Sequence, residues 1–280
     1  MTTESRTGRG MSFVSPLSSQ VALFPVSLPD EPYLERRGYG ISVTVTPRVA
    51  SEWVYGKTPR LLLAYIQTLI VRKSPDVDMD NQCVTIRGSF REFCRKSGIP
   101  CNGTSRMELE RTLESLAGLT ITVIRDSPDE ETPDGFRRVR TSSTVARRVE
   151  SRSVDDDTIA RVWFNPPFWS ELVKSSVPLD KSAMLRLGKS PRAFDIFTWL
   201  SYRTNGLSHP VRVTWEQLFV QFEATDMPRG KFRAKFKASL DVVLRECPTF
   251  KVTVDKDGVV YYPRKKVIAD TGEHKEEGDE

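Results

Sequence analysis

Apolar residues recur at helical spacing in two stretches of this chain, and the two stretches open with nearly the same residues. The sequence KTPR at 57–60 precedes the first stretch, and KSPR at 189–192 precedes the second, 132 residues later. Each opening is followed by the same expected order of helix, short strand, short helix, long helix and strand pair. This order is the layout of a winged helix, a helix-turn-helix backed by a β-hairpin. The pattern therefore predicts an α+β fold with two tandem winged-helix domains.

Capping and turn residues place the individual elements. Ser and Thr favour helix N-termini, Gly favours C-termini, and an Asp-Gly pair favours a tight hairpin turn. In the first copy these signals predict, in order, a helix capped by Thr58, a strand at 83–87, a helix from Ser89 to Gly98, a helix at 105–117, and strands at 119–125, 136–149 and 158–164. In the second copy they predict a helix capped by Ser190, a strand at 211–213, a helix capped by Thr214, a helix at 229–246, and a hairpin of strands at 250–254 and 259–262.

Composition divides the chain into four expected parts. Residues 1–30, which are rich in Ser, Thr, Gly and Pro, are expected to form a flexible N-terminal arm. An Asn-Pro-Pro run at 165–167 marks the expected boundary between a first winged-helix domain at 31–165 and a second at 166–266. Residues 267–280 are polar and acidic and are expected to form a disordered tail.

The charge of the chain favours a polyanionic partner. The formal net charge is +5, but six acidic residues and one lysine give residues 270–280 a charge of −5, which leaves +10 on residues 1–269. A basic body of this size is typical of a nucleic-acid-binding protein. The chain has no apolar run long enough to cross a bilayer and no basic segment followed by an apolar signal region. We therefore expect a cytoplasmic protein with no membrane partner.

Motifs for metal binding and catalysis are absent or incomplete. The four cysteines form no CxxC pair, and only His209 and His274 are available to complete a site, so we expect no bound metal. The GKT at 56–58 and the GKS at 188–190 resemble the end of a phosphate-binding loop, but the first glycine of that motif is missing and Pro follows each time. His209 is the one plausible base for a Ser or Cys nucleophile. We expect neither a cofactor nor an enzymatic activity.

The helix expected at 229–246 carries the strongest sign of DNA binding. Its apolar residues, among them Phe232 and Phe236, fall on one arc and must pack inward. The remaining surface combines small residues at its centre with cations on both flanks and at the first turn: Arg229, Lys231, Arg233, Ala234, Lys235, Lys237 and Ala238. Small residues allow close approach to base edges, while long cations reach phosphates or guanine. The alternative is a solvated basic helix face, but the place of this helix before a hairpin favours binding to duplex DNA.

The corresponding helix at 105–117 predicts a weaker contact with DNA. It exposes three carboxylates, from Glu108, Glu110 and Glu114, which repel phosphate. The first domain is therefore expected either to make fewer DNA contacts or to serve in self-association. Its candidate DNA-binding residues are Thr104, Ser105, Arg106 and Arg111. A further set of strand arginines either tracks a DNA backbone or only solubilises the surface: Arg137, Arg138, Arg140, Arg147, Arg148 and Arg152.

Five phrases of the sequence occur together in one known family. They are YGKTPRLLL at 55–63, GSFREFC at 88–94, VPLD at 177–180, SPRAFDIFTWLSYR at 190–203 and VTWEQL at 213–218. With them the chain resembles the RepA family of plasmid replication initiators. The resemblance implies a bacterial, paired winged-helix initiator that binds repeated duplex sites at a plasmid origin, opens an adjacent A·T-rich segment and helps to load the host helicase. It also implies a homodimer that represses its own promoter and a monomer that binds the origin.

Two other functions fit the same residues. A double winged-helix transcriptional repressor would use the same helix, and it would lack tandem repeats beside an A·T-rich segment that sustain a plasmid. A protein-interaction module would bind DNA weakly and would keep its function after alanine replaces the four cations Lys231, Arg233, Lys235 and Lys237. A non-enzymatic initiator that binds double-stranded DNA is the leading hypothesis.

Overall fold

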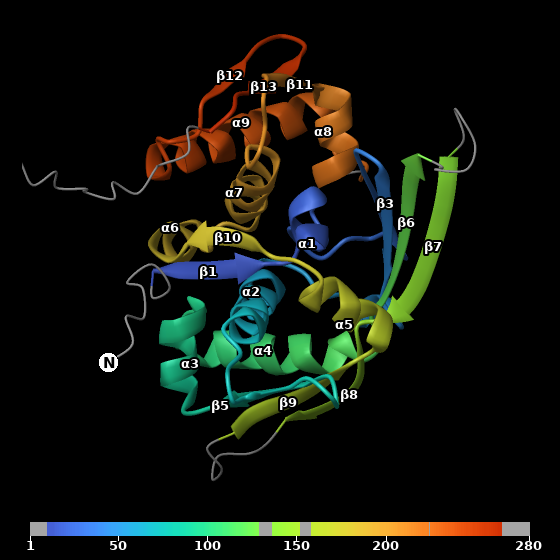
Figure 1. Cartoon of the computed structure of the whole chain (residues 1–280), viewed down its shortest axis with the longest axis vertical. Helices are drawn as coiled ribbons and strands as arrows, with labels where there is room; N and C mark the ends of the chain where they lie inside the picture. The colour runs from blue at the N-terminus through green and yellow to red at the C-terminus, as the bar shows by residue number, and fades with distance from the viewer. Residues whose placement is uncertain (1–9, 129–135, 152–157, 224, 265–280) are drawn as a thin grey trace, which may run out of the picture.

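The structure, a computed structural model of the whole chain, describes residues 10–128, 136–151, 158–223 and 225–264. The acidic tail expected at 267–280 lies outside these ranges. Two groups of helices, each with a small sheet, are stacked along the long axis of the molecule, and a larger sheet runs beside both (Figure 1). The expected α+β class is confirmed for the part of the chain that is described.

The first half of the molecule lies at the bottom of Figure 1 and contains a four-stranded antiparallel sheet. Its elements are α2 (Lys57–Val71), β4 (Val77–Asp78), β5 (Cys83–Arg87), α3 (Phe90–Ser97), α4 (Gly103–Leu116), β8 (Ala146–Ser151) and β9 (Thr158–Phe164), with the strand order β4-β5-β9-β8. Ser89 caps α3 and Gly98 ends it in the left-handed conformation, as expected. Thr58 does not cap α2, because Gly56 holds that position and the buried Thr58 hydroxyl donates to Glu108 of α4.

The second half lies at the top of Figure 1 and repeats this topology. Its elements are α7 (Pro191–Arg203), β11 (Val211–Thr214), α8 (Trp215–Phe222), α9 (Arg229–Glu246), β12 (Val252–Val254) and β13 (Gly258–Tyr261), with the strand order β11-β13-β12. Ser190 caps α7, and Thr214 caps α8 in a capping box, both as expected. In each half the strand that precedes the second helix pairs with the last strand, β5 with β9 and β11 with β13.

The repeat does not predict the third sheet, which flanks both halves. Its antiparallel strands, in the order β2-β3-β6-β7, are β2 (Leu34–Gly38), β3 (Ile41–Thr46), β6 (Thr120–Pro128) and β7 (Phe136–Thr144). Val43, Val45 and Ile121 alternate with polar residues and are buried on one face. Since β2 packs against α8 while β6 and β7 are inserted after α4, the sheet connects the second half to the first.

The N-terminal segment corrects the expectation of a flexible arm at 1–30. Strand β1 (Met11–Val14) pairs antiparallel with β10 (Val177–Asp180), and helix α1 (Pro16–Gln20) follows it. Val14, Leu17 and Leu23 are buried. The β1–β10 ribbon lies between the two halves (Figure 1). Residues 10–30 of the expected arm are therefore part of the fold, because this segment pairs its backbone and buries its apolar side chains. Residues 1–9 of the expected arm lie outside the described residues.

The Asn-Pro-Pro run at 165–167 begins a helix and does not separate two domains. Pro166 lies in the first turn of α5 (Pro166–Val173), and Phe168 and Trp169 of this helix stack on Phe164 of β9 with ring centroids 6.0 and 5.8 Å away. Helix α5 also packs against α2 and β7, whereas the next helix, α6 (Lys181–Leu187), packs against α7 and α9. The expected boundary is therefore wrong, because α5 packs with the first half.

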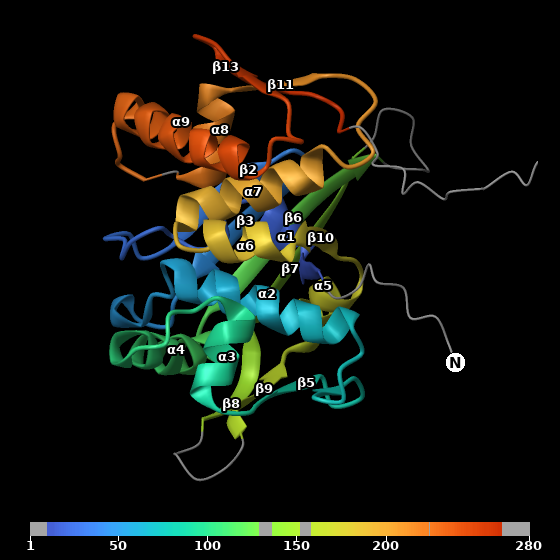
Figure 2. The same cartoon turned by 90° about the vertical axis from the view of Figure 1, so that its left-hand side faces the viewer.

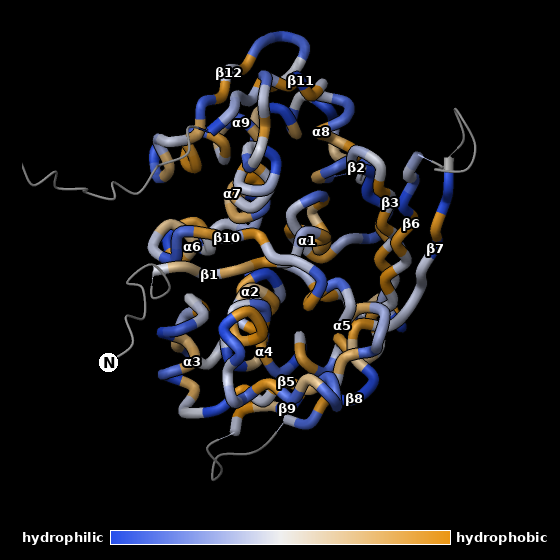
Figure 3. Tube along the Cα trace, viewed as in Figure 1, coloured by the Kyte–Doolittle hydropathy of each residue, from blue (hydrophilic) through white to orange (hydrophobic). Residues whose placement is uncertain are grey.

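One continuous apolar core joins the halves. Buried side chains from α2, α7, β1, β10 and the third sheet belong to a single cluster, which also includes Trp53 just after the short 3-10 helix η1 (Ala50–Glu52). In Figure 3 hydrophobic positions gather along β10 and α2, where the halves meet, while the outer turn between β12 and β13 is hydrophilic. The relative placement of α4 and α9 is thus set by packed side chains and not by a linker.

Candidate nucleic-acid interface

Helix α9 has the inner face that its sequence predicts. Phe232, Phe236, Leu240 and Val243 have no exposed surface. The Phe232 ring meets the Phe219 ring of α8 at 5.2 Å, and Phe236 meets the rings of Phe222 and Trp215 of the same helix at 5.2 and 6.0 Å. These edge-on contacts fix the rotation of α9 about its axis.

The opposite face of α9 is exposed and basic in its first three turns. The side chains predicted to contact DNA there are all exposed: Lys231, Arg233, Ala234, Lys235, Lys237 and Ala238. Within the described residues none of the four cations forms an ion pair with a carboxylate. Arg233 and Lys237 extend over the Trp215 ring at 5.9 and 5.4 Å from its centroid, which orders these two side chains beside the helix. The basic region ends at the exposed Asp241.

Arg229, which was expected to contact phosphate, is bound to side chains of α8. Its guanidinium forms two hydrogen bonds with the Glu216 carboxylate, of 2.9 and 3.0 Å, and lies 3.4 Å from the centroid of the Phe219 ring. Both partners belong to α8. The side chain therefore holds the first turn of α9 against α8, and its charge is already compensated by Glu216.

The hairpin of β12 and β13 stands beside the two helices. Asp255 accepts the N–H groups of Asp257 and Gly258 and pairs with Arg212 of β11 at 2.6 Å, and this arginine lowers the pKa of the Asp255 carboxyl. The Trp215 indole N–H donates to the Asp255 carbonyl at 3.2 Å, so the start of α8 is tied to the turn. A Cβ at Gly258 would lie 2.1 Å from the Val213 carbonyl oxygen, which explains the glycine.

Helix α4 of the first half presents a different surface. Thr104, Arg106 and Arg111 are exposed as expected, but Ser105 is only 4% exposed. Asn102, and not Thr104 or Ser105, caps the helix by accepting the Ser105 N–H. The structure thus buries Ser105, which the prediction of a DNA contact required to be exposed.

The two arginines of α4 have partners within the first half. Arg106 pairs with Glu110 at 3.2 Å, and Arg111 donates to the Ser51 carbonyl at 2.8 Å and lies over the Tyr55 ring at 5.4 Å. Glu110 and Glu114 are exposed beside them. Figure 2 shows α4 and α9 on the same side of the molecule, at its lower and upper ends.

Several strand arginines in the first half are also engaged. Arg138 pairs with Asp126 and Arg148 with Glu150, while Arg147 donates to the Gln82 side chain and to backbone carbonyls. The exposed Arg137 and Arg140 of β7 have no carboxylate partner among the described residues, and Arg152 lies outside them. This surface thus offers two unpaired cations, against four on α9.

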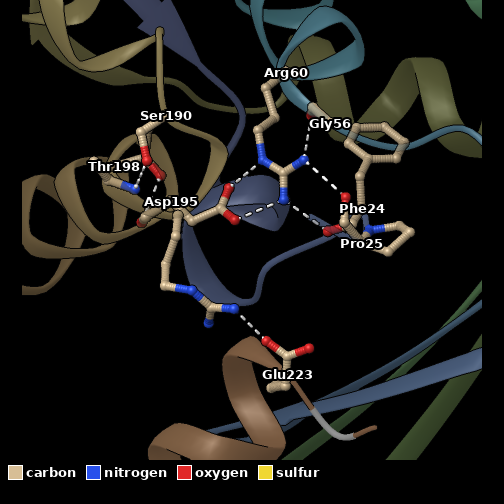
Figure 4. A network of polar contacts seen from close by, with 10 residues as sticks. Phe24, Pro25, Gly56, Arg60, Ser190, Asp195, Thr198 and Glu223 are labelled. Carbon is tan, nitrogen blue, oxygen red and sulfur yellow. Dashed lines mark hydrogen bonds and ion pairs between the residues drawn. The ribbon is translucent and has the colours of Figure 1, made fainter. Parts of the chain in front are cut away.

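A buried network of charged residues joins the halves, and the sequence pattern alone does not reveal it (Figure 4). Arg60, from the KTPR opening of the first copy, makes two hydrogen bonds of 2.7 Å with the carboxylate of Asp195 on α7. It also donates to the backbone carbonyls of Phe24 and Gly56. Arg192, the equivalent residue of the second copy, pairs with Glu223. The sequence does show that both openings contain an arginine at the same place. It does not show which carboxylate each arginine pairs with.

A third arginine completes this buried cluster. Arg36 of β2 is 2% exposed, and its Nε has no hydrogen-bond partner. Burial lowers the pKa of Arg36 to about 10, against the opposing effect of the carboxylates of Glu223 and Asp195. Three cations and two carboxylates are thus enclosed where the halves and the third sheet meet.

The described residues offer little for metal or thiol chemistry. They contain no group of three or more His, Cys, Asp or Glu side chains that could hold a metal ion. Burial raises the pKa of Cys94 to about 12 and that of Cys247 to about 11, so neither thiol is ionised near pH 7. Among the described helices, none is both long and apolar enough to span a membrane.

Comparison with known families finds one family whose match includes both repeated openings. The family described as plasmid encoded RepA protein matches residues 53–217, which is more than half of the chain. The chain belongs to the RepA family of plasmid replication initiators. The matched region runs from Trp53 through both KTPR-type openings to Gln217 in α8, so it includes the whole first half and ends before α9.

Comparison with solved structures supports the fold. A crystal structure of selenomethionine derivatives of domains 2 and 3 of RctB aligns with a TM-score of 0.53 at 13% identity, covering 89% of this chain and 96% of that chain. A second structure of RctB domains 2–3 aligns with a TM-score of 0.48 at 12% identity, covering 86% of this chain and 93% of that one. No curated protein sequence matches the chain. At this identity the first likeness concerns the fold alone.

Proposed function

We propose that this RepA-family chain is a non-enzymatic initiator that binds repeated duplex sites at a plasmid origin through two winged-helix halves. It would act in the cytoplasm of a bacterial host. One observation carries the proposal: α9 buries its phenylalanines and exposes Lys231, Lys235 and their neighbours, which have no carboxylate partner among the residues that the structure describes. An exposed basic helix beside a hairpin is the arrangement with which winged helices enter a major groove.

The repeated topology supports the assignment of both halves as winged helices. Each half has a helix, a strand, two further helices and then a strand pair; the first half also has the short β4 and the inserted β6 and β7. In both sheets the last strand lies between the two others of this series, β9 between β5 and β8, and β13 between β11 and β12. Helix α9 takes the place of the recognition helix in the second half, and α4 takes it in the first. Ala234 and Ala238 at the outward centre of α9 allow a close approach to base edges, and the flanking cations reach the phosphates.

The difference in charge between α4 and α9 supports different roles for the two halves in DNA binding. Helix α4 carries exposed carboxylates, and its two exposed arginines are engaged within the first half, Arg106 by Glu110 and Arg111 by the Ser51 carbonyl. The second half is therefore the principal reader of DNA, and the first half makes fewer contacts or serves in a homodimer. Opening of A·T-rich duplex and contact with the host helicase or initiator belong to the proposal through the family resemblance.

Duplex binding measured against salt tests the proposal. Four cations that neutralise phosphates predict a slope of log affinity against log salt of about −4, because each releases about 0.9 counterion. The variant K231A/K235A should weaken binding and flatten that slope. The matched control R137A/R140A removes the same charge from unpaired arginines of β7 and should change binding little. Equal losses in the two variants would contradict the assignment to α9.

A plasmid assay separates an initiator from a repressor. DNA that flanks the gene of this protein is placed on a plasmid without another origin, with the protein supplied in trans. An initiator sustains that plasmid when the fragment holds tandem repeats beside an A·T-rich segment. Specific binding without plasmid maintenance would favour the repressor, and absence of both activities would favour a protein-interaction module.

A further inference from the structure

A basic pocket lies away from α9, between α2, α3 and α6. It has a volume of about 400 Å³, and four cations line it: Arg72, Arg95, Lys96 and Lys181. They come from the C-terminal end of α2, from α3 and from the first residue of α6. Helices α2 and α3 lie on one side of β1 and α6 lies on the other (Figure 1). The pocket therefore opens where the first half meets the β1–β10 ribbon and α6.

Two of the four cations in this pocket have no carboxylate partner within the part of the chain that the structure describes. Among the described residues, Arg95 and Lys181 form no ion pair. Lys96 pairs with Glu92 at 2.7 Å, and Asp76, the carboxylate that lines the pocket, pairs with Arg87 outside it at 2.8 Å. Arg95 and Lys181 thus bring positive charge to the pocket that no described carboxylate pairs with.

Lys181 is the most enclosed by the neighbouring cations of the three helices, as the causes of its lowered pKa indicate. Burial lowers the pKa of its ammonium group, and the charges of Arg72, Arg95 and Lys96 lower it further. Like charges that converge from three elements cost free energy unless an anion occupies the space between them. An anion bound between Arg95 and Lys181 would reduce this repulsion.

The rest of the lining suits a phosphate group on a larger molecule. Ser12, Tyr65 and Thr68 also line the pocket, and so do the apolar residues Leu69 and Met184. The Thr68 hydroxyl is already engaged, because it donates to the Ala64 carbonyl and accepts the Phe13 N–H. Guanidinium and ammonium groups bind phosphate oxygens with charge-assisted hydrogen bonds. Apolar wall beside them accommodates a carbon-bearing group such as a sugar or a base.

We propose that this pocket binds a phosphate group carried by a nucleotide or by the DNA backbone, held by Arg95 and Lys181 with Arg72 and Lys96. The site is separate from the basic face of α9. A bound phosphate bridges α3 of the first half and α6, which packs against α7 and α9 of the second, so it also stabilises the junction between the halves.

Thermal unfolding of the full chain with added phosphates tests the site. Inorganic phosphate, pyrophosphate and ADP are compared with sodium chloride at equal ionic strength. At least one phosphate should raise Tm in proportion to the logarithm of its concentration. In R95Q/K181Q the rise should disappear, while Tm without ligand should stay equal or increase because the repulsion is gone. The control R140Q should keep the rise.

Duplex binding by the same variants identifies the source of the phosphate. If no small phosphate raises Tm but R95Q/K181Q weakens duplex binding by about tenfold while R140Q does not, the site takes a backbone phosphate. An equal Tm rise in the wild type and in R95Q/K181Q overturns the proposal. So does the absence of both effects. The small-phosphate measurement gives its answer even if α9 does not bind DNA, so failure of either proposal is distinguishable from failure of the other.

Discussion

Helices α4 and α9 hold the same place in two copies of one topology, yet their outer surfaces differ. Each buries an apolar stripe, Leu109 and Leu113 in α4 and Phe232 and Phe236 in α9. Outside, α4 exposes carboxylates, one of which pairs with Arg106, whereas α9 exposes four cations without carboxylate partners among the described residues. Burial thus preserves the inner face of both helices, while the outer face is free to specialise because its residues have little effect on folding.

The largest effect should come from the buried stripes that the two helices share. Changing Phe236 to Ala removes a ring packed against Trp215 and Phe222 and should lower the free energy of unfolding by about 3–5 kcal/mol. Changing Leu113 to Ala in α4 should cost about 2–5 kcal/mol. Urea denaturation followed by fluorescence and circular dichroism measures both.

The continuous core predicts how those two variants unfold. Because one cluster of side chains joins the halves, each variant should shift a single transition for the whole molecule. Two separate transitions, one for each half, would show that the halves are independent domains. The exposed Met107 of α4 supplies a control, since Met107→Ala should change stability by less than about 0.5 kcal/mol.

The next effect concerns the ion pair that connects the two copies. Changing Asp195 to Ala leaves Arg60 buried and unpaired and should cost about 3–5 kcal/mol. Changing Glu110 to Ala in α4 breaks a pair whose side chains are about half exposed and should cost less than about 1 kcal/mol. Similar costs in the same denaturation experiment would show that the junction is not closed to solvent.

A gain of binding tests whether α4 lies near DNA. Changing Glu110 and Glu114 to Gln removes two exposed carboxylates, and leaves Glu108 to accept its hydrogen bond from Thr58. If the first half approaches phosphates, duplex affinity should rise by about twofold to tenfold at low salt, since exposed charges interact weakly and are screened. Fluorescence anisotropy measures the change. Unaltered affinity would place α4 away from the duplex.

The smallest effect should be the loss of one cation from α9. Changing Lys235 to Ala should reduce the slope of log affinity against log salt by about 0.9, because one fewer counterion is released. Arg106→Ala in α4 should leave the slope unchanged, since its charge is compensated by Glu110. An equal reduction of the slope in both variants would show that α4 and α9 do not differ in their contacts with phosphates.

Local patterns in the sequence were sufficient for the helical elements of both copies. The sequence predicted the bounds of α9 and its buried phenylalanines. It also predicted the helix caps at Ser89, Ser190 and Thr214. Each of these features depends on residues within a few turns of one helix. The RepA-family resemblance was also available from short phrases. These signals do not need a partner far away in the chain.

The tertiary structure decided what depends on distant partners. Met11 pairs with Asp180 across the ribbon, so a segment with the composition of a flexible arm became part of the fold. Arg60 pairs with the carboxylate of Asp195 in the other copy. The sequence shows only that an arginine is repeated near the start of two helices. Composition and periodicity describe how one segment folds, but burial and ion pairing depend on which segments meet, and that is determined only when the whole core packs.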